Sequence, residues 1–304
     1  MVFKVKRVIY KITASEIAAT LGLHWVGPDV TVSGVSPYPP DEENTLCFNG
    51  KDGNAAEVLP ADCVVIAREE GREAMLKLGA SVIVSANPKY DFSRLFALLA
   101  PRVDWGVHPT AHIGPQVALA DQVTIGPGCV LDGDIQIGNG TRIGANVVLR
   151  NSVRIGSNVT MRNGSVIGED AFSFGFSQPD HTRAEAIRFP CFGSVIISDH
   201  VEIGNNCVIS RGTFRDTILG ERARINDLVH IGNEVQIGER TTITAHTDIS
   251  ARVKIGKGCW VGQSAAIRQG LTIGDGTVIG MGAVVIKDVA ATTVVVGVPA
   301  RVLS

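Results

Sequence analysis

Two histidines and an aspartate in the second half of this 304-residue chain could carry out acid–base chemistry. His230 lies in the stretch LVHIGNEV, and His246 and Asp248 lie in ITAHTDIS. Histidine titrates closest to neutral pH, which suits it to take a proton from an attacking group. A carboxylate beside the imidazole would fix its tautomer and raise its basicity. These residues therefore indicate a histidine general base with an orienting aspartate, provided that the fold brings them together.

The surrounding chain repeats with a period of six residues. Every sixth position is aliphatic between residues 113 and 167 and again, after two interruptions, up to residue 285; the next position is often glycine. A short strand and a turn, repeated in this way, predict a parallel β-helix whose aliphatic side chains stack in the interior. The aliphatic positions are Ile113, Leu119, Ile125, Leu131, Ile137, Ile143, Leu149, Ile155, Met161, Ile167, Ile197, Ile203, Ile209, Leu219, Ile225, Ile231, Ile237, Ile243, Ile249, Ile255, Val261, Ile267, Ile273, Ile279 and Val285.

Three six-residue units make one coil, and this spacing places the candidate residues. Successive coils of a parallel β-helix lie about 4.8 Å apart. His230 and Asp248 are separated by one coil of the repeat, so their side chains are expected to be stacked neighbours on its outer face. Such a pair could equally be a surface ladder contact worth a fraction of a kcal/mol. Catalytic and structural roles both remain open for it.

Two interruptions of the repeat indicate chain that leaves the coil. The longer one predicts an external loop over residues 168–196, and the shorter one is a slip over residues 210–218. Long loops on rigid scaffolds often carry function, although a tolerated insertion would look the same in the sequence.

The predicted fold class is mainly β: a left-handed parallel β-helix of hexapeptide repeats with a small N-terminal α/β domain. Residues 1–105 lack the repeat and form the α/β domain, residues 106–290 form the β-helix, and residues 291–304 form a C-terminal tail. The elements expected in the first domain are helices at 13–23 and 91–100 and buried strands at 62–67 and 80–85.

Composition excludes several classes of function. The formal net charge of −2 gives no electrostatic reason to expect nucleic acid as a partner. We expect no membrane span, because no apolar run approaches the required length, and a cytoplasmic location. The six cysteines form no CxxC motif and no metal-ligand cluster, so neither a metal site nor a bound cofactor is expected. Cys129, Cys207 and Cys259 occupy the same position of the repeat and are expected to be buried and inert.

Four stretches of sequence carry a more specific likeness. They are GVSPYPPDEENTLCFNGK in the first domain, VIGEDAFSFGF before the loop, GSVIISDHVEIG after it and ISRGTFRDTILG at the slip. With them, residues 10–285 resemble the UDP-3-O-acylglucosamine N-acyltransferases of lipid A synthesis. The resemblance implies a left-handed coil and a homotrimer with active sites between subunits. It also implies acyl transfer from a thioester donor to the amine of a UDP-linked amino sugar, for lipid A or another surface glycan.

The candidate site departs from the pattern of that family. The family's catalytic histidine, in an I-A-H-N motif, aligns with Asn233, and a second histidine aligns with Gly270. Aromatic residues that stack on uracil align with Leu46 and Asp52, whereas Asn49 matches the family residue.

The resemblance also suggests which residues contact substrate. The backbone amide of Ala251 would stabilise the oxyanion of the tetrahedral intermediate. The general base would be His230 or His246, both of which resemble histidines of the O-acylating relatives, with Asp248 beside His230. The expected substrate-binding residues are Asn49, Lys51, Asn233, Ala251 and Gln269.

Several alternatives stay open. The acyl thioester co-substrate could be carried by acyl carrier protein or by coenzyme A. We expect no C-terminal helices of the kind found in that family, and the stretch GVPAR resembles the tail of coenzyme A-dependent hexapeptide acetyltransferases. If neither histidine acts, the chain would be a trimeric nucleotide-sugar binding or scaffold protein. A metal-dependent hydratase would need three converging histidines, which the repeat does not supply.

Overall fold

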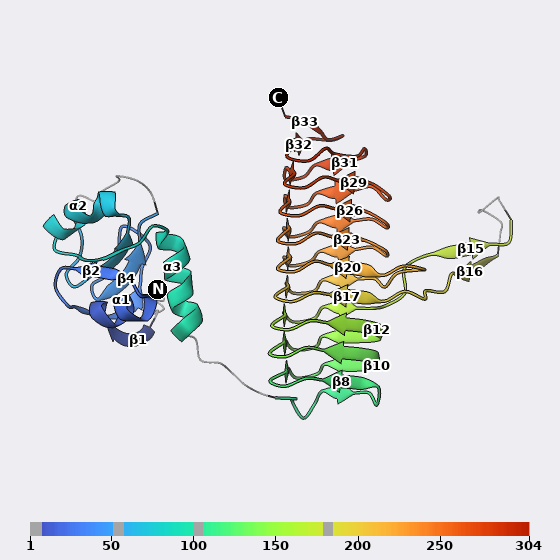
Figure 1. Ribbon diagram of the computed structural model, residues 1–304, viewed down its shortest axis with the longest axis horizontal. Helices are drawn as coiled ribbons and strands as arrows, with labels where there is room; N and C mark the ends of the chain where they lie inside the picture. Colours follow the sequence, from blue (N-terminus) through green and yellow to red (C-terminus); the bar gives the residue numbers. More distant parts are fainter. Residues whose placement is uncertain (1–7, 51–57, 100–105, 179–184, 304) are drawn as a thin grey trace, which may run out of the picture. The chain divides into compact units, whose positions relative to one another are not determined.

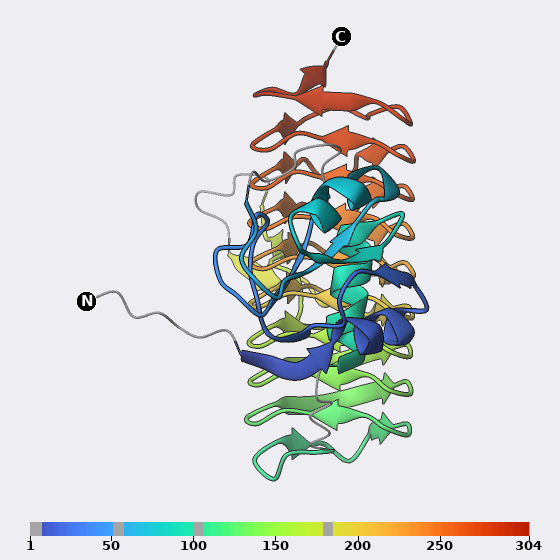
Figure 2. The same ribbon diagram turned by 90° about the vertical axis from the view of Figure 1, so that its left-hand side faces the viewer.

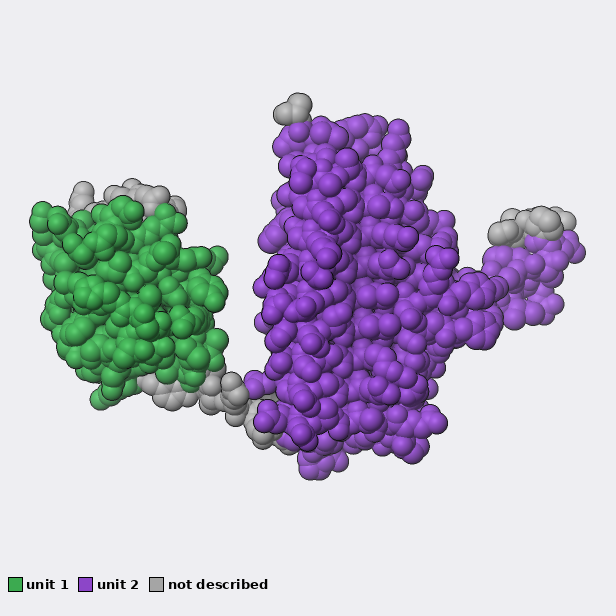
Figure 3. All heavy atoms as spheres, viewed as in Figure 1, with its two compact units in different colours: residues 1–102 green, residues 103–304 purple. Residues whose placement is uncertain are grey.

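The computed structural model describes residues 8–50, 58–99, 106–178 and 185–303 (Figure 1). The chain divides into two compact units, Met1–Arg102 and Val103–Ser304, which are coloured separately in Figure 3. The boundary expected from the sequence, residue 105, falls in the 100–105 segment, which lies outside the described residues.

The first unit is a six-stranded sheet with helices on both faces. The strand order is β1-β3-β4-β5-β6-β2, and β3, β4, β5 and β6 run parallel. The elements are β1 (Val8–Thr13), α1 (Ala14–Leu21), β2 (His24–Val26), β3 (Thr31–Val35), β4 (Thr45–Phe48), β5 (Val64–Ala67), the 3₁₀ turn η1 (Glu69–Gly71), α2 (Arg72–Lys77), β6 (Ser81–Val84) and α3 (Pro88–Leu99).

Local sequence signals account for these elements. The Thr13 side chain accepts a hydrogen bond from the Glu16 amide while the Glu16 carboxylate accepts one from the Thr13 amide, so a capping box begins α1. Gly22, with φ 65°, ends the helix in a left-handed conformation. The predicted helices and buried strands of this unit all appear within a few residues of their expected positions.

The second unit is a parallel β-helix, and its short strands stack in three columns (Figures 1 and 2). The first column contains β7 (His112–Ile113), β14 (Val166–Ile167), β19 (Val208–Ile209), β22 (His230–Ile231), β25 (Asp248–Ile249), β28 (Ala266–Ile267) and β31 (Val284–Val285). The second contains β8 (Val117–Leu119), β17 (Val195–Ile197), β20 (Thr217–Leu219), β23 (Gln236–Ile237), β26 (Lys254–Ile255) and β29 (Thr272–Ile273). The third contains β9 (Thr124–Ile125), β11 (Arg142–Ile143), β13 (Thr160–Met161), β18 (Glu202–Ile203), β21 (Arg224–Ile225), β24 (Thr242–Ile243), β27 (Trp260–Val261), β30 (Val278–Ile279) and β32 (Val294–Val296).

The repeat residues form the core of this unit. From Ile125 onward, the aliphatic positions predicted from the period of six are buried and belong to one continuous hydrophobic cluster. Each coil therefore buries the apolar surface of the coil below it, which is the source of stability in such solenoids. Residues 291–304, set apart in the sequence analysis as a tail, add β32 to the third column and then β33 (Arg301–Val302) antiparallel to it.

One edge of the coil differs from the other two. We call the segments that join the first column to the second the variable edge, and those at the other two corners the uniform edges. The strands β10 (Val130–Ile137) and β12 (Val148–Ile155) run through the variable edge without a corner. Later on the same edge come the loop after β14, the slip, and a shortened connection over residues 286–288. The slip was expected over residues 210–218, but it ends at residue 216 because Thr217 already begins β20.

The loop projects from the variable edge as a hairpin. Its strands β15 (Phe174–Phe176) and β16 (Ala186–Arg188) pair antiparallel and extend away from the coil (Figure 1). The expected external loop is therefore present. It ends at residue 194 rather than 196, because Val195 and Ile196 already pair with β12 as part of β17.

Candidate active site

His230 and Asp248 form a direct contact on the first column. They occupy equivalent positions of the adjacent parallel strands β22 and β25. His230 Nδ1 lies 2.6 Å from Asp248 Oδ1, and the two side chains are 50% and 54% exposed. The expectation that these residues are stacked neighbours is confirmed.

This contact determines which ring nitrogen is free. A carboxylate can only accept, so the neutral imidazole carries its proton on Nδ1 and leaves the Nε2 lone pair available. Within the described ranges Nε2 makes no hydrogen bond to another residue. The arrangement has the form of a histidine base oriented by a carboxylate.

His246 stands apart from this pair. It lies at a uniform edge, where its backbone adopts φ 60° and its amide donates to the Asp227 carbonyl at 3.1 Å. The equivalent left-handed corner position of other coils holds residues such as Asn206 and Leu228, so the position does not demand a histidine. The side chain is exposed, and in the described part of the chain it makes no polar contact with His230 or Asp248.

Asn233 lies on the variable edge, immediately after β22. Its Nδ2 donates to Thr213 Oγ1 at 3.0 Å, so the side chain is held by the slip segment below it. Because the side-chain nitrogen already donates to Thr213, Oδ1 is the atom that remains to accept a hydrogen bond from a ligand. Asn233 itself has no titrating group and cannot act as a base.

Glu234 holds the slip segment in place, a role that sequence reasoning missed. Its Oε1 accepts hydrogen bonds from the amides of Phe214 and Arg215, at 2.8 and 3.3 Å. Its own amide donates to Thr217 Oγ1 at 2.9 Å. No sequence motif announces these bonds, because the slip has an irregular length and its register over the next coil is set by packing.

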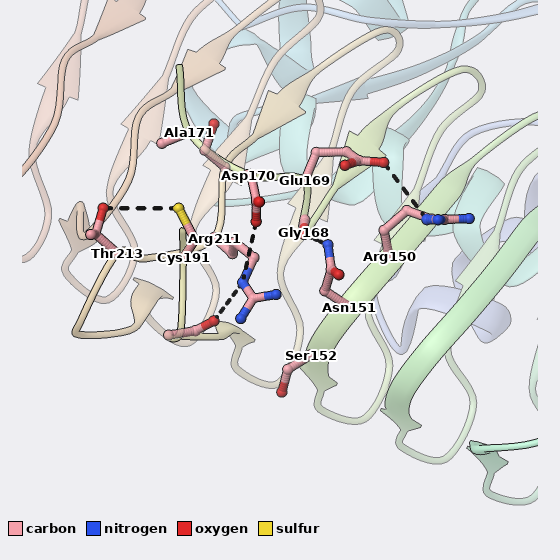
Figure 4. A network of polar contacts seen from close by, with 12 residues as sticks. Arg150, Asn151, Ser152, Gly168, Glu169, Asp170, Ala171, Cys191, Arg211 and Thr213 are labelled. Carbon is pink, nitrogen blue, oxygen red and sulfur yellow. Dashed lines mark hydrogen bonds and ion pairs between the residues drawn. The ribbon is translucent and has the colours of Figure 1, made fainter. Parts of the chain in front are cut away.

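The base of the loop is tied to the same slip segment (Figure 4). Arg211 donates from Nε to the Gly193 carbonyl at 2.9 Å, and its guanidinium lies 3.9 Å from Asp170. The Arg211 amide donates to the Glu169 carbonyl at 3.0 Å. A single residue thus binds both ends of the loop, and Thr213, two residues further along, contacts Asn233.

Ala251 and Gln269 continue the variable edge above Asn233. On the uniform edges, some coils carry Asn or Asp at the repeat position that Ala251 occupies here, and its side chain accepts a hydrogen bond from a backbone amide one coil below. Asn163 Oδ1 accepts from the Ala145 amide, and Asp275 Oδ1 accepts from the Lys257 amide, both at 2.8 Å. Alanine cannot do this. Across the described ranges, the amides of Asn233 and Ala251 donate to no other residue.

Gln269 and Gly270 are both exposed on the variable edge. Gly270 has φ 75°, and its amide donates to the Ala251 carbonyl at 2.9 Å. Glycine suits this left-handed corner. The structure brings no other candidate residue into contact with the Gln269 side chain among those it describes.

The residues expected to bind a nucleotide lie in the first unit. Asn49 is buried at the carboxyl end of β4, and its backbone amide donates a hydrogen bond to the Ile66 carbonyl at 2.9 Å. Leu46 is 0% exposed and packs in the core, so it has no surface on which a base could stack. Lys51 and Asp52 lie outside the described residues. Beyond β5 and β6, Arg68 and Ser85 help to line a hollow of about 510 Å³.

Cysteine and metal chemistry find no support in the described residues. Burial raises the pKa of the Cys129, Cys207 and Cys259 thiols, which keeps them protonated and unreactive. No group of three or more His, Cys, Asp or Glu side chains could hold a metal ion within the described ranges. No helix of the described chain is long and apolar enough to cross a membrane.

Comparison with known proteins first identifies the structural class of the second unit. The model of the bacterial transferase hexapeptide family, which spans six repeats, matches residues 134–169 and 252–287. The UDP-N-acetylglucosamine O-acyltransferase of Moraxella catarrhalis aligns with a TM-score of 0.59 and 25% identity, over 65% of this chain and 74% of that one. The UDP-N-acetylglucosamine acyltransferase of Francisella novicida aligns with a TM-score of 0.58 and 25% identity, over 64% and 68%. The fold is that of the left-handed β-helix acyltransferases.

Sequence relatives then identify the family. The UDP-3-O-acylglucosamine N-acyltransferase of Neisseria meningitidis is 41% identical over 245 residues, which is 73% of this chain and 68% of that protein. The enzyme of the same name from Leptothrix cholodnii is 37% identical over 72% of this chain and 69% of that protein. The chain belongs to the UDP-3-O-acylglucosamine N-acyltransferase family.

Proposed function

We propose that this protein transfers an acyl group from a thioester to the amine of a UDP-linked amino sugar in lipid A or related glycan synthesis. The observation that carries the proposal is the 2.6 Å contact between His230 Nδ1 and Asp248 Oδ1, within a fold and family of acyltransferases. His230 lies three residues before Asn233, which aligns with the family's catalytic histidine, and we propose that it serves as the base in its place.

In this reaction the amine nitrogen attacks the thioester carbonyl carbon. Nε2 of His230 takes a proton from the nitrogen as the C–N bond forms. The carbonyl oxygen becomes an oxyanion, which the free amide of Ala251 can stabilise by donating a hydrogen bond. When the intermediate collapses, the C–S bond breaks and the imidazolium returns its proton to the departing thiolate. Asn233 Oδ1 would accept a hydrogen bond from the sugar substrate.

We further propose that the protein works as a homotrimer. The loop and the slip expose several aromatic rings: Phe189 and Phe192 both lie against Phe214, with ring centroids 5.8 and 6.3 Å apart. Phe214 is 70% exposed. Exposed apolar patches of this kind mark surfaces that bind other molecules, and a second copy of this chain suits a family that acts between subunits. A monomeric mass in light scattering would contradict this.

For the nucleotide we propose the carboxyl ends of the parallel strands in the first unit. Ligands of open α/β sheets bind at this edge. Asn49 is there, and Lys51 follows it in sequence. The donor is an acyl thioester carried by acyl carrier protein or coenzyme A.

One experiment tests the activity directly. The full chain is incubated with UDP-linked amino sugars and either acetyl-coenzyme A or a hydroxyacyl carrier protein, and products are identified by mass spectrometry. The proposal predicts an acylated amine whose formation requires His230. If His246→Ala abolishes turnover and His230→Ala retains it, the base is His246.

A second candidate function is a nucleotide-sugar binding protein without turnover. The replacement of the family histidines by Asn233 and Gly270 favours it. UDP-sugar binding in calorimetry, with no product from either donor, would establish this alternative.

A further inference from the structure

A hollow of about 250 Å³ lies on the third column of the coil, outside the candidate active site. Trp260 and Arg224 line it together with Thr242, and these three occupy one outward-facing position on three successive strands, β27, β24 and β21. Because the short Thr242 lies between two long side chains, the surface is notched. The notch spans two coil spacings, about 10 Å.

Trp260 is an unusual residue for this exposed face. Its side chain is 51% exposed on a short strand. The same column position holds Thr160, Glu202 and Thr242 on other coils, so the fold does not require an indole here. An exposed indole provides a flat apolar surface on which a planar ring can stack.

The charges around the hollow leave one cation free. Arg162 is paired with Glu202 at 3.2 Å, and Asp227 accepts hydrogen bonds from the amide and side chain of Asn205. Arg224 also lines the hollow, and in the described chain its guanidinium forms no hydrogen bond or ion pair. Both carboxylates therefore have hydrogen-bond or ion-pair partners, although the Asn205 donors are neutral and leave Asp227 its negative charge. Among the described residues that line the hollow, Arg224 is the cation whose side chain has no partner.

We propose that this hollow binds a nucleoside phosphate, with the base stacked on Trp260 and a phosphate paired with Arg224. The combination fits because aromatic rings bind bases by stacking. Guanidinium groups bind phosphate through paired hydrogen bonds.

The position of the hollow connects it with the candidate base. Asp227, on its border, belongs to the corner that leads from β21 to β22, where His230 lies. Arg224 and His230 are six residues apart, so at most about 20 Å of chain separates them. Because the proposed function places UDP in the first unit, a nucleotide held here belongs to the acyl donor, as the adenosine phosphate of coenzyme A. UDP is the probe for the other source. The assignment of the bound nucleotide to a substrate rests on the proposed function. The proposal that the hollow binds a nucleoside phosphate does not.

Calorimetry on the full chain tests the site with coenzyme A and UDP as separate probes. We expect Trp260→Ala and Arg224→Gln each to weaken the Kd of one probe by about tenfold or more. Arg142→Gln, an exposed arginine of the same column outside the hollow, is the matched control and should leave both Kd values unchanged. If the two variants weaken the binding of coenzyme A, the hollow binds the acyl donor. If they weaken the binding of UDP, the hollow binds the acceptor.

Two results would overturn the proposal. Either both probes keep their Kd in both variants, or Trp260→Ala changes the oligomeric mass in light scattering, which would make this face a contact between copies. Binding is measured without turnover, so failure of the hollow is distinguishable from failure of the proposed acyl transfer.

Discussion

The variable edge and the uniform edges of the coil are built from the same six-residue repeat, yet they differ in regularity. On the uniform edges, Asn and Asp side chains such as Asn163 and Asp275 accept hydrogen bonds from the coil below. The variable edge carries the loop, the slip and the shortened connection, and it places Ala251 where such a side chain would stand. The comparison teaches that the stacked core tolerates irregular lengths at one corner, and that the candidate site lies beside that corner.

The largest effect is expected from the base next to the variable edge. His230→Ala should lower kcat by about a hundredfold or more, the usual contribution of a general base. His246→Ala changes a histidine on a uniform edge and should leave kcat unchanged. Steady-state kinetics of both variants checks this pair, and equal rates for His230→Ala and the wild type would refute the assignment. Asp248→Asn should lower kcat less than His230→Ala does, because the imidazole that takes the proton remains in place.

Breaking the anchor of the slip should have the next largest effect. Glu234→Ala removes the acceptor for the amides of Phe214 and Arg215, so we expect a loss of about 1–3 kcal/mol in the free energy of unfolding. Because Thr213 positions Asn233, kcat/KM should fall as well. Denaturant titration and kinetics measure the two effects. The control is Glu239→Ala, which removes an exposed contact with Lys257 and should change both quantities little.

Converting the variable edge into a uniform one should raise stability and reduce activity. Ala251→Asn supplies a side chain that can accept from the Asn233 amide, as Asn163 does for Ala145. We expect about 0.5–1.5 kcal/mol of added stability. The reverse change on a uniform edge, Asp275→Ala, should lower the stability by a similar amount and leave kcat unchanged. Thermal unfolding measures the stabilities, and a destabilised Ala251→Asn would contradict the comparison.

The smallest effect is expected from thiol chemistry on the uniform edges, where Cys129, Cys207 and Cys259 lie. Burial raises the pKa of Cys129, Cys207 and Cys259, so these thiols stay protonated to a higher pH than exposed ones. Folded protein treated with iodoacetamide near pH 8 should therefore remain unlabelled at these positions, and labelling should appear on unfolding. Mass spectrometry of the peptides provides the measurement. Rapid labelling of the folded chain would show that the coil opens locally.

The sequence could predict features that depend on spacing alone. The period of six determines which side chains enter the core, and one coil of spacing determines that His230 faces Asp248. Both follow because every coil of a parallel stack repeats the geometry of the one below. The cap of α1 could also be predicted, since Thr13 and Glu16 meet within one turn.

Contacts between segments of irregular length could not be predicted in this way. The sequence located the loop and the slip but gave no register for their contacts, so the bonds of Arg211 to both ends of the loop were missed. Likewise the alignment placed Leu46 at a stacking position of the family. Only the packed sheet shows that this side chain points into the core.

The sequence by itself therefore determined the coil, its apolar interior and the partner of His230, because these depend on short-range strand geometry repeated without change. The tertiary structure alone decided how the slip holds Asn233 and how Glu234 holds the slip. The same spacing puts Arg224, Thr242 and Trp260 in one register, but only the structure shows the hollow that they line. Those arrangements depend on how side chains of different coils fill the space around an irregular corner or a short residue, and no local pattern encodes that fit.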